Sequence, residues 1–477
     1  MTDPTTLAAG FPAATAADWR GLVEKTLKGE SLESLNRTTL EGLPIAPLYA
    51  GDEAPAAVFT PRPYDADRPW DIRVGVAHPD PGRANSDLMR DLEGGAASGV
   101  IRIDPTGLSG VAIGSAEGLA AAIRDVVLEL APIGLDAGFL GPKAADWLAA
   151  AAKGSPAAKL QFHLDPLSAF AESGESPGPI ESHLISAATV ASRLADIHPQ
   201  AGLFLASGRV VHEAGGGEAG ELAFAMAAAV AYAKALVRAG LTLERAFAGV
   251  VLGLSADADY FATLAKLRAA RAVWDRITNA CGVQTPARIE ARSSHRMLAA
   301  KDPWTNMLRL TAAAVGAGVG GADAVILGTF TDALGQPTAF ARRQSRNAQL
   351  VLMEEAHLGR VDDPAAGSGY VEALTDEMAR AAWARFQAIE ARGGLVEALT
   401  SGLIAADLDE VRKAREAAGQ PRIVGVTAFP VAKEGEIEVD HPPAKAVDAP
   451  SPRLPGPDGH CPPLKSVRLA EPYEAAQ

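Results

Sequence analysis

The side chains best suited to chemistry gather in residues 203–217. An apolar run ends at Ser207, His212 and Glu213 follow, and three glycines close the segment. A histidine beside a carboxylate can transfer protons as a general acid or base. Adjacent residues on an extended chain point to opposite sides, however. A hydrogen bond that anchors the loop is therefore favoured over catalysis for His212 and Glu213.

Two other groups of polar residues are candidates for binding. His163 and Asp165 flank Leu164 on one face of a predicted strand, but Pro166 ends that strand and indicates a structural turn. His295 lies among arginines and could bind a phosphate, although a capping or interface role is favoured. No histidines have a metal-binding spacing such as His-x-x-x-His, so no metal site is predicted in this chain.

These residues need a scaffold, and alternating strands and helices over residues 95–430 supply one. No Gly-x-Gly-x-x-Gly fingerprint follows an early strand, which disfavours a doubly wound sheet. The pattern predicts an α/β (β/α)8 TIM barrel, in which functional residues lie at the carboxyl ends of the strands. The expected strands are Val100–Ile103, Ile133–Leu140, Lys159–Asp165, Leu203–Val211, Ala248–Leu254, Arg288–Ser293, Ala324–Thr329 and Gly359–Asp362.

Long helices are expected between these strands. On one of them Lys266, Arg268 and Arg271 accompany an apolar stripe, which predicts a barrel helix with a solvated basic face. The expected helices are Ala116–Leu130, Ser186–Ile197, Glu218–Arg238, Ala258–Asn279 and Pro303–Val315.

The chain divides into three predicted parts. Residues 1–70 form an extended N-terminal arm with an amphipathic helix, Ala17–Lys28, capped by Asp18. Residues 71–432 form the barrel. Residues 433–477 form a Pro-rich linker or wrapping tail, with nine prolines from Glu434 onward. An arm this long has no core of its own, so it is expected to pack on the barrel or on a partner chain.

Composition narrows the class of protein. The net charge of −14 disfavours nucleic acid and anionic membranes as partners. Two cysteines, far apart, disfavour a disulfide framework. The first residues do not read as a signal peptide, and no stretch reaches 18 uninterrupted apolar residues. A cytoplasmic protein is expected.

Several short segments occur in a characteristic order along the chain. They are Thr39-Leu40-Glu41-Gly42, Arg68-Pro69-Trp70-Asp71-Ile72-Arg73, Ser207-Gly208 with Glu213-Ala214-Gly215, Ala265–Arg271 with Trp274, Arg346-Asn347, and Gly367–Glu372. Taken together, these segments resemble the cobalamin-dependent acyl-CoA mutases of the methylmalonyl-CoA mutase family. The resemblance extends over nearly the whole chain and implies a TIM barrel.

This chain departs from the family at the positions that the resemblance marks as functional. A substrate-wedging tyrosine corresponds to Gly75, and the catalytic histidine corresponds to Val210. A polar Gln-Ser-Leu-His lining the coenzyme A channel corresponds to Ala324–Leu327, so Leu327 and its neighbours predict an apolar, filled interior. No arginine stands where the family pairs one with the substrate carboxylate, and no Asp-x-His-x-x-Gly motif is present to ligate cobalt.

The resemblance therefore implies the non-catalytic small (beta) subunit of a heterodimeric methylmalonyl-CoA mutase. Its partner would be a large (alpha) subunit that binds adenosylcobalamin and interconverts methylmalonyl-CoA and succinyl-CoA by a radical rearrangement. No cofactor is expected on this chain. Two alternatives stay open: a substrate-binding subunit of another cobalamin-dependent acyl-CoA mutase, and an accessory protein that protects or loads the cobalamin enzyme.

Overall fold

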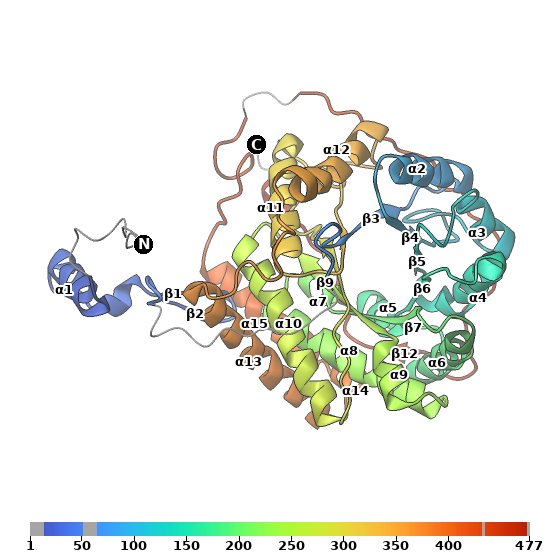
Figure 1. Ribbon diagram of the computed structural model, residues 1–477, viewed down its shortest axis with the longest axis horizontal. Helices are drawn as coiled ribbons and strands as arrows, with labels where there is room; N and C mark the ends of the chain where they lie inside the picture. The colour runs from blue at the N-terminus through green and yellow to red at the C-terminus, as the bar shows by residue number, and fades with distance from the viewer. Residues whose placement is uncertain (1–13, 51–63, 432–434, 475–477) are drawn as a thin grey trace, which may run out of the picture.

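The computed structural model describes residues 14–50, 64–431 and 435–474. Its centre is a closed barrel of eight parallel strands in the order β10-β11-β3-β4-β5-β6-β8-β9, surrounded by helices (Figure 1). The barrel strands are β3 (Asp71–Val76), β4 (Ser98–Arg102), β5 (Ile133–Asp136), β6 (Gln161–Leu164), β8 (Gly202–Ser207), β9 (Val250–Ala256), β10 (Ile289–Ser293) and β11 (Ala324–Ile326). The predicted (β/α)8 fold is confirmed.

Helices connect the strands and cover the outside of the barrel. They are α2 (Pro81–Glu93), α3 (Ala116–Ala122), α4 (Gly141–Ala151), α5 (Pro166–Ser173), α6 (Ile180–Ile197), α7 (Arg209–Glu213), α8 (Glu218–Arg238), α9 (Leu243–Ala248), α10 (Tyr260–Ala280), α11 (Asn306–Val319) and α12 (Ala339–Leu350). Three more follow the barrel: α13 (Gly369–Ala391), α14 (Leu395–Thr400) and α15 (Leu403–Ala417). Of these, α13 packs across α8 and α10 as a second layer.

One predicted strand is wrong. Residues Gly359–Asp362 form bends after a π-helical turn, Val351–Glu355, and the barrel closes instead through β3, which pairs with β11 and β4. The sequence of β3 does not read as a core strand because Arg73 interrupts it. The Arg73 guanidinium is buried and satisfied: it lies 2.8 Å from Asp71 and 2.7 Å from Glu290.

Helix α8 is the most deeply buried helix of the layer around the barrel. It is long and apolar enough to cross a membrane by length and composition alone, but 72% of its most apolar window is buried inside the protein. It packs on β8, β9, α10 and α13. This is the environment of a core helix.

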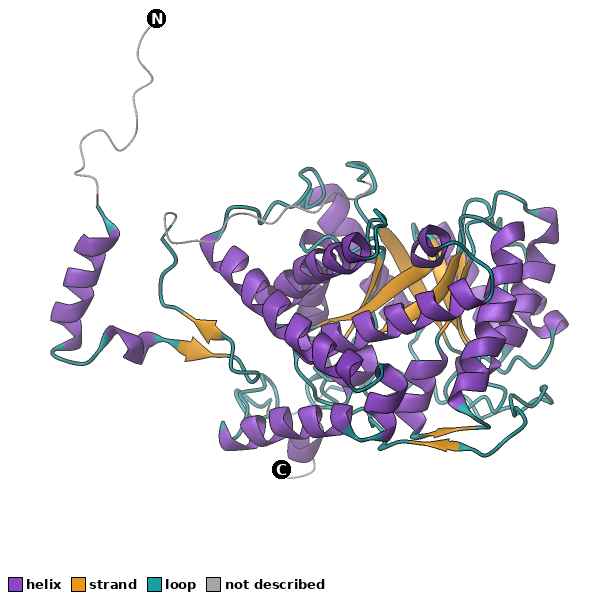
Figure 2. Cartoon of the chain, turned by 90° about the horizontal axis from the view of Figure 1, so that it is seen from below, coloured by secondary structure: helices purple, strands orange, loops and turns teal. Residues whose placement is uncertain are grey.

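The N-terminal arm stands away from the barrel in both views (Figures 1 and 2). It holds α1 (Ala16–Leu27), with no buried side chain, and a ladder of β1 (Arg37–Thr38) with β2 (Pro44–Ile45). The N-cap of α1 is Thr15; Asp18 is the third residue of the capping box, so the predicted cap is displaced by three residues. The Glu41 carboxylate anchors the arm by accepting hydrogen bonds from Ala219 and Gly220 at the start of α8.

The tail, residues 435–474, runs around the rim at the carboxyl ends of the strands. It contacts the loops after β11, β4, β6, β8 and β10 in that order, so it makes almost one full turn of the barrel. Its β12 (Gly459–His460) pairs with β7 (Glu175–Ser176), a ladder visible beside the barrel in Figure 2, and it ends in α16 (Glu471–Glu474). Other backbone contacts join Asp440 to Gln336, Val447 to Pro105, Leu454 to Pro177, Val467 to Glu213 and Leu469 to Arg296.

Candidate functional site

A cavity of about 820 Å³ lies at the carboxyl ends of the barrel strands. Gly75, Val210 and Leu327, which come from three separate strands or their following turns, all line it, as does Glu213. The filled apolar interior predicted from Ala324–Leu327 is therefore wrong at the mouth. A Cβ atom at Gly75 would meet only one atom within 4 Å, the Cγ2 of Ile326 at 3.9 Å, so this glycine leaves space open.

The predicted strand 203–211 ends four residues early, at Ser207, and a short helix begins at Arg209. The cause lies at Gly208, where a Cβ atom would stand 2.2 Å from the Glu221 carbonyl oxygen. Only glycine lets the chain pass this close to α8 and turn. His212 and Glu213 are thus on a helical turn, so the argument from alternating strand faces does not apply to them.

The side chains of Glu213 and His212 contact different parts of the protein. The Glu213 carboxylate accepts backbone hydrogen bonds from His295 and Arg296, both at 3.1 Å, and so holds the loop after β10. His212 is fully buried behind α7 and does not line the cavity. The two side chains therefore form no acid–base pair.

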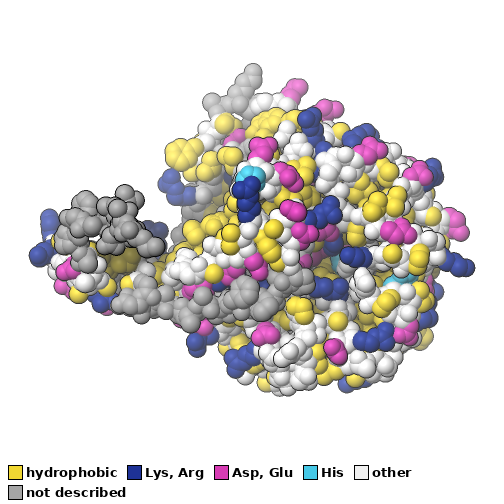
Figure 3. All heavy atoms as spheres, viewed as in Figure 1, with side chains coloured by type: hydrophobic (Ala, Val, Ile, Leu, Met, Phe, Trp, Pro, Cys, Tyr) yellow, Lys and Arg dark blue, Asp and Glu magenta, His cyan; other side chains and the backbone are white. Residues whose placement is uncertain are grey.

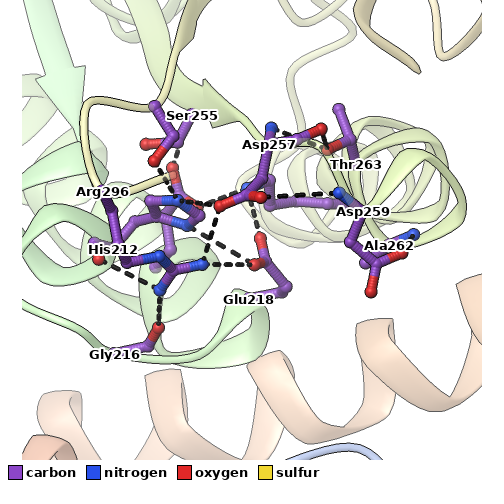
Figure 4. A network of polar contacts seen from close by, with 12 residues as sticks. His212, Gly216, Glu218, Ser255, Asp257, Asp259, Ala262, Thr263 and Arg296 are labelled. Carbon is purple, nitrogen blue, oxygen red and sulfur yellow. Dashed lines mark hydrogen bonds and ion pairs between the residues drawn. The ribbon is translucent and has the colours of Figure 1, made fainter. Parts of the chain in front are cut away.

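His212 lies in a buried network of charges between α7, α8, α10 and the loop after β10 (Figure 4). Its Nε2 lies 3.1 Å from Asp257 and 2.9 Å from the Ser294 hydroxyl, while Nδ1 lies 3.3 Å from Glu221 and 3.4 Å from Glu218. Burial by itself lowers the pKa of His212. The two glutamates outweigh that effect and raise the pKa to about 10.

Lys266 and Arg296 complete this network. The Lys266 ammonium lies between both glutamates, 2.5 Å from Glu221, and Arg296 lies 3.1 Å from Asp257 and 3.5 Å from Glu218. Three cations thus face three carboxylates. His212, Glu218 and Glu221 lie close enough to hold a metal ion by distance alone, but the ammonium already sits on both carboxylates.

The predicted solvated basic face of α10 is wrong. Lys266 is fully buried, and Arg268 and Arg271 are 6% and 5% exposed. Arg268 binds Asp363 and Glu372, while Arg271 donates to the carbonyls of Ala287 and Gly321 and to Asp323. Because α8, α11 and α13 surround α10, the charged side of this helix faces other elements and not water.

Charged side chains line the cavity itself. Arg292 donates to Asp136 at 3.4 Å and lies 3.7 Å from Glu290. Arg209 has one ion pair, a loose one of 3.8 Å to Glu213, and makes no hydrogen bond to any other residue that the structure describes. Burial and the positive charge of Arg292 lower the pKa of Arg209. Arg209 is therefore a weakly compensated cation at the mouth.

His163 and Asp165 also line the cavity. His163 has a left-handed backbone, with φ of 48°, and neither ring nitrogen finds a partner among the described residues. Burial lowers the pKa of His163 to about 4. Asp165 caps α5 through Ser168, in keeping with the expected turn, and accepts the Tyr232 hydroxyl; burial raises its pKa to about 7.

The structure does not bring together the phosphate-binding residues that were considered around His295. His295 and Arg292 line the cavity, but Arg296 turns away into the buried network. Reasoning from the sequence missed Arg209 as a cavity residue, although it directly precedes Val210. The sequence does contain a signal for the buried charge network. Glu218 and Glu221 are three residues apart at the start of a predicted helix, so they share one face of it.

The comparisons with known proteins agree with the geometry. A family model described as methylmalonyl-CoA mutase matches residues 61–451. The methylmalonyl-CoA mutase small subunit of Streptomyces virginiae is 40% identical over 93% of this chain and 74% of its own length. That of Propionibacterium freudenreichii subsp. shermanii is 34% identical, over 92% and 73%. A probable small subunit of Mycobacterium bovis is 41% identical, over 76% of this chain and 61% of its own length.

These matches confirm the resemblance drawn from the short segments. They extend it over a length that the segments alone do not cover, and they include the residues of the barrel and of its mouth. The chain belongs to the methylmalonyl-CoA mutase family.

Proposed function

We propose that this chain is the non-catalytic small subunit of a heterodimeric methylmalonyl-CoA mutase. A large subunit would interconvert methylmalonyl-CoA and succinyl-CoA. The observation that carries the proposal is Val210, which lines the cavity where the family places a catalytic histidine. An isopropyl group neither donates a proton nor hydrogen-bonds a thioester carbonyl. The names of the Streptomyces and Propionibacterium relatives support the assignment to a small subunit.

The residues at the mouth do not fit adenosylcobalamin, which lies over the barrel mouth in this family. The tail contributes Asp440, His441, Leu464 and Ser466 to the cavity lining, and so occupies part of that opening. We therefore assign the cofactor to the partner chain and route no chemical step through this one.

The arm supports a role in assembly. It carries exposed leucines that the barrel does not cover, including Leu22 at 64%, Leu40 at 41% and Leu48 at 44% exposed. Hydrophobic side chains are visible on it in Figure 3. Apolar side chains on a projecting segment gain free energy when another chain covers them. The partner we propose for the arm is the large subunit.

Co-expression with the product of the neighbouring gene tests the proposal. Turnover of methylmalonyl-CoA with added adenosylcobalamin would be measured for each chain alone and for the pair. We expect a one-to-one complex that is active, and this chain alone to be inactive. Val210→His should leave the isolated chain inactive, because Gly75 and Leu327 still lack the family's side chains. Turnover by this chain alone would overturn the proposal.

Two further measurements distinguish the small subunit from the two alternatives. A substrate-binding subunit of another acyl-CoA mutase would bind an acyl-CoA in its own barrel, which equilibrium dialysis of the isolated chain detects. An accessory protein would associate only transiently and would be absent from the active enzyme after gel filtration. Stable one-to-one recovery without acyl-CoA binding supports the small subunit.

A further inference from the structure

The cavity keeps polar groups that the proposed structural role does not use. Three of them lie at the ends of different elements: Arg209 on α7, Arg292 on β10 and His163 on β6. The Nε atoms of both arginines and both ring nitrogens of His163 are buried without a hydrogen-bond partner among the described residues. Buried polar groups are nearly always satisfied, so a cluster of unsatisfied ones at one cavity indicates a ligand.

The cluster brings arginines together with carboxylates, and Arg209 has only a loose ion pair among them, at 3.8 Å. Three guanidiniums, those of Arg292, Arg102 and Arg209, act together on one carboxylate, Asp136, and lower its pKa. Glu213 is the ion-pair partner of Arg209, but its oxygens already accept the backbone hydrogen bonds of His295 and Arg296. Arg209 makes no hydrogen bond to a described residue, so its planar donor fork can bind a carboxylate through two parallel hydrogen bonds.

The rest of the lining decides between an inorganic and an organic anion. Aliphatic side chains line the cavity together with the charged cluster, and they are Val74, Val76, Val100, Leu135, Leu205, Val210, Leu298, Ile326 and Leu327. A volume of about 820 Å³ lies within the range of small-molecule sites, which combine apolar walls with a few fixed polar groups. Phosphate has no apolar part to place against the aliphatic walls, whereas a carboxylic acid with a short hydrocarbon chain would bury its methylene groups against part of them.

We propose that the barrel of this chain binds a small free carboxylate, with Arg209 and Arg292 holding the carboxylate group and the aliphatic wall around Val210 and Leu327 holding the hydrocarbon chain. The site differs from a coenzyme A site because it needs neither a thioester nor a long channel. The tail residues Leu464 and Ser466 line the same cavity. The bound acid therefore lies between the barrel and the tail.

Calorimetric titration of the 477-residue chain with butanoate tests this site. We expect saturable binding of butanoate and a rise in melting temperature, and no binding of butanamide, which has the same shape without the charge. Arg209→Met should weaken butanoate binding by about 10- to 100-fold, the usual loss for one charge-assisted pair. Arg193→Met, on the outside of α6, is the matched control and should bind as the wild type does.

A second variant tests the other wall without altering charge. Val210→Phe fills part of the cavity beside Arg209 and should also weaken butanoate binding, while the melting temperature of the unliganded chain stays near that of the wild type. Three results would overturn the proposal: no saturable butanoate binding, unchanged binding in Arg209→Met, or phosphate binding as tight as butanoate. None of these outcomes bears on whether the chain is a small subunit, which the co-expression experiment decides.

Discussion

At the scale of single residues, His163 shows how burial sets a charge at the mouth. Its ring lies inside the barrel beside Arg73 and Arg292, and burial together with these cations keeps it neutral, with a pKa of about 4. Asp165, two residues on, is shifted in the opposite sense, to about 7. Both shifts favour the uncharged forms of these groups. The stability of the barrel should therefore depend on pH at both positions.

His163→Asn tests the first of these dependences. The unfolded chain binds a proton at His163 near pH 6.5, whereas the folded chain binds it only near pH 4. Stability from this residue is therefore present above pH 6.5 and is lost as the pH falls toward 4. The variant should reduce the slope of unfolding free energy against pH in that window, by at most about 1.4 kcal/mol per pH unit.

Urea unfolding at half-unit pH steps measures that slope. His357→Asn is the control, because His357 also has a left-handed backbone, with φ of 54°, but is exposed. Asparagine tolerates this conformation at either position. Equal slopes for the wild type and His163→Asn would contradict the assignment of the acid sensitivity to His163.

At the scale of elements, α10 shows what the sequence could and could not predict. The apolar stripe of α10 predicts its packing on the barrel, and the bounds predicted for α8, Glu218–Arg238, are those observed. The burial of Lys266 was not predictable, because its partners lie on α8 and a second layer, α13, covers α10 from outside. Hydrophobic periodicity predicts the one helix face that packs on the core, and it does not indicate whether another helix buries the opposite face.

The candidate site was likewise predictable from the sequence only in part. The family pattern singles out Gly75, Val210 and Leu327, and the structure brings all three to one cavity. The helical turn of α7 and the left-handed backbone at His163 depend on close packing, such as that of Gly208 against Glu221, which no local pattern encodes. The part of the site that rests on tertiary contacts, Arg209 above all, therefore came only from the structure.

Lys266→Met tests the charge network at the level of these two helices. The change leaves Glu218 and Glu221 buried without the ammonium between them, and we expect a loss of about 3–5 kcal/mol in unfolding free energy. Lys234→Met is the matched control on α8, where an exposed lysine pairs with Glu390 at 2.8 Å and should contribute no more than about 1 kcal/mol.

Denaturant unfolding of both variants gives the comparison. Adding Glu221→Gln to Lys266→Met should recover part of the loss, since one uncompensated charge is then removed. If the two lysine variants lost the same small free energy, the network would not stabilise the fold in the way proposed.

At the scale of the whole molecule, the arm precedes the barrel in the chain, the tail follows it, and the two segments contact the barrel to different extents. The tail contacts loop after loop of the same chain, whereas α1 of the arm buries none of its side chains against the barrel. The arm is thus the segment whose removal should disturb assembly more than folding.

Leu22→Asp combined with Leu40→Asp tests the arm. Both side chains are exposed on this chain, so the melting temperature should not change, but affinity for the large subunit should fall by about tenfold or more if the partner buries them. Sedimentation of the mixed subunits measures the affinity. Ile185→Asp, on α6 and 66% exposed, is the control and should assemble as the wild type does. Normal assembly of the arm variant would rule out this surface as an interface.

The course of the tail also has a consequence for the order of events during synthesis. A ribosome releases residues 435–474 only after all eight barrel strands have emerged, so the rim is closed last. A small molecule can therefore reach the newly folded barrel before the final segment narrows its opening. The tail then lines part of the cavity, and the order of synthesis makes it the last part of the wall to form.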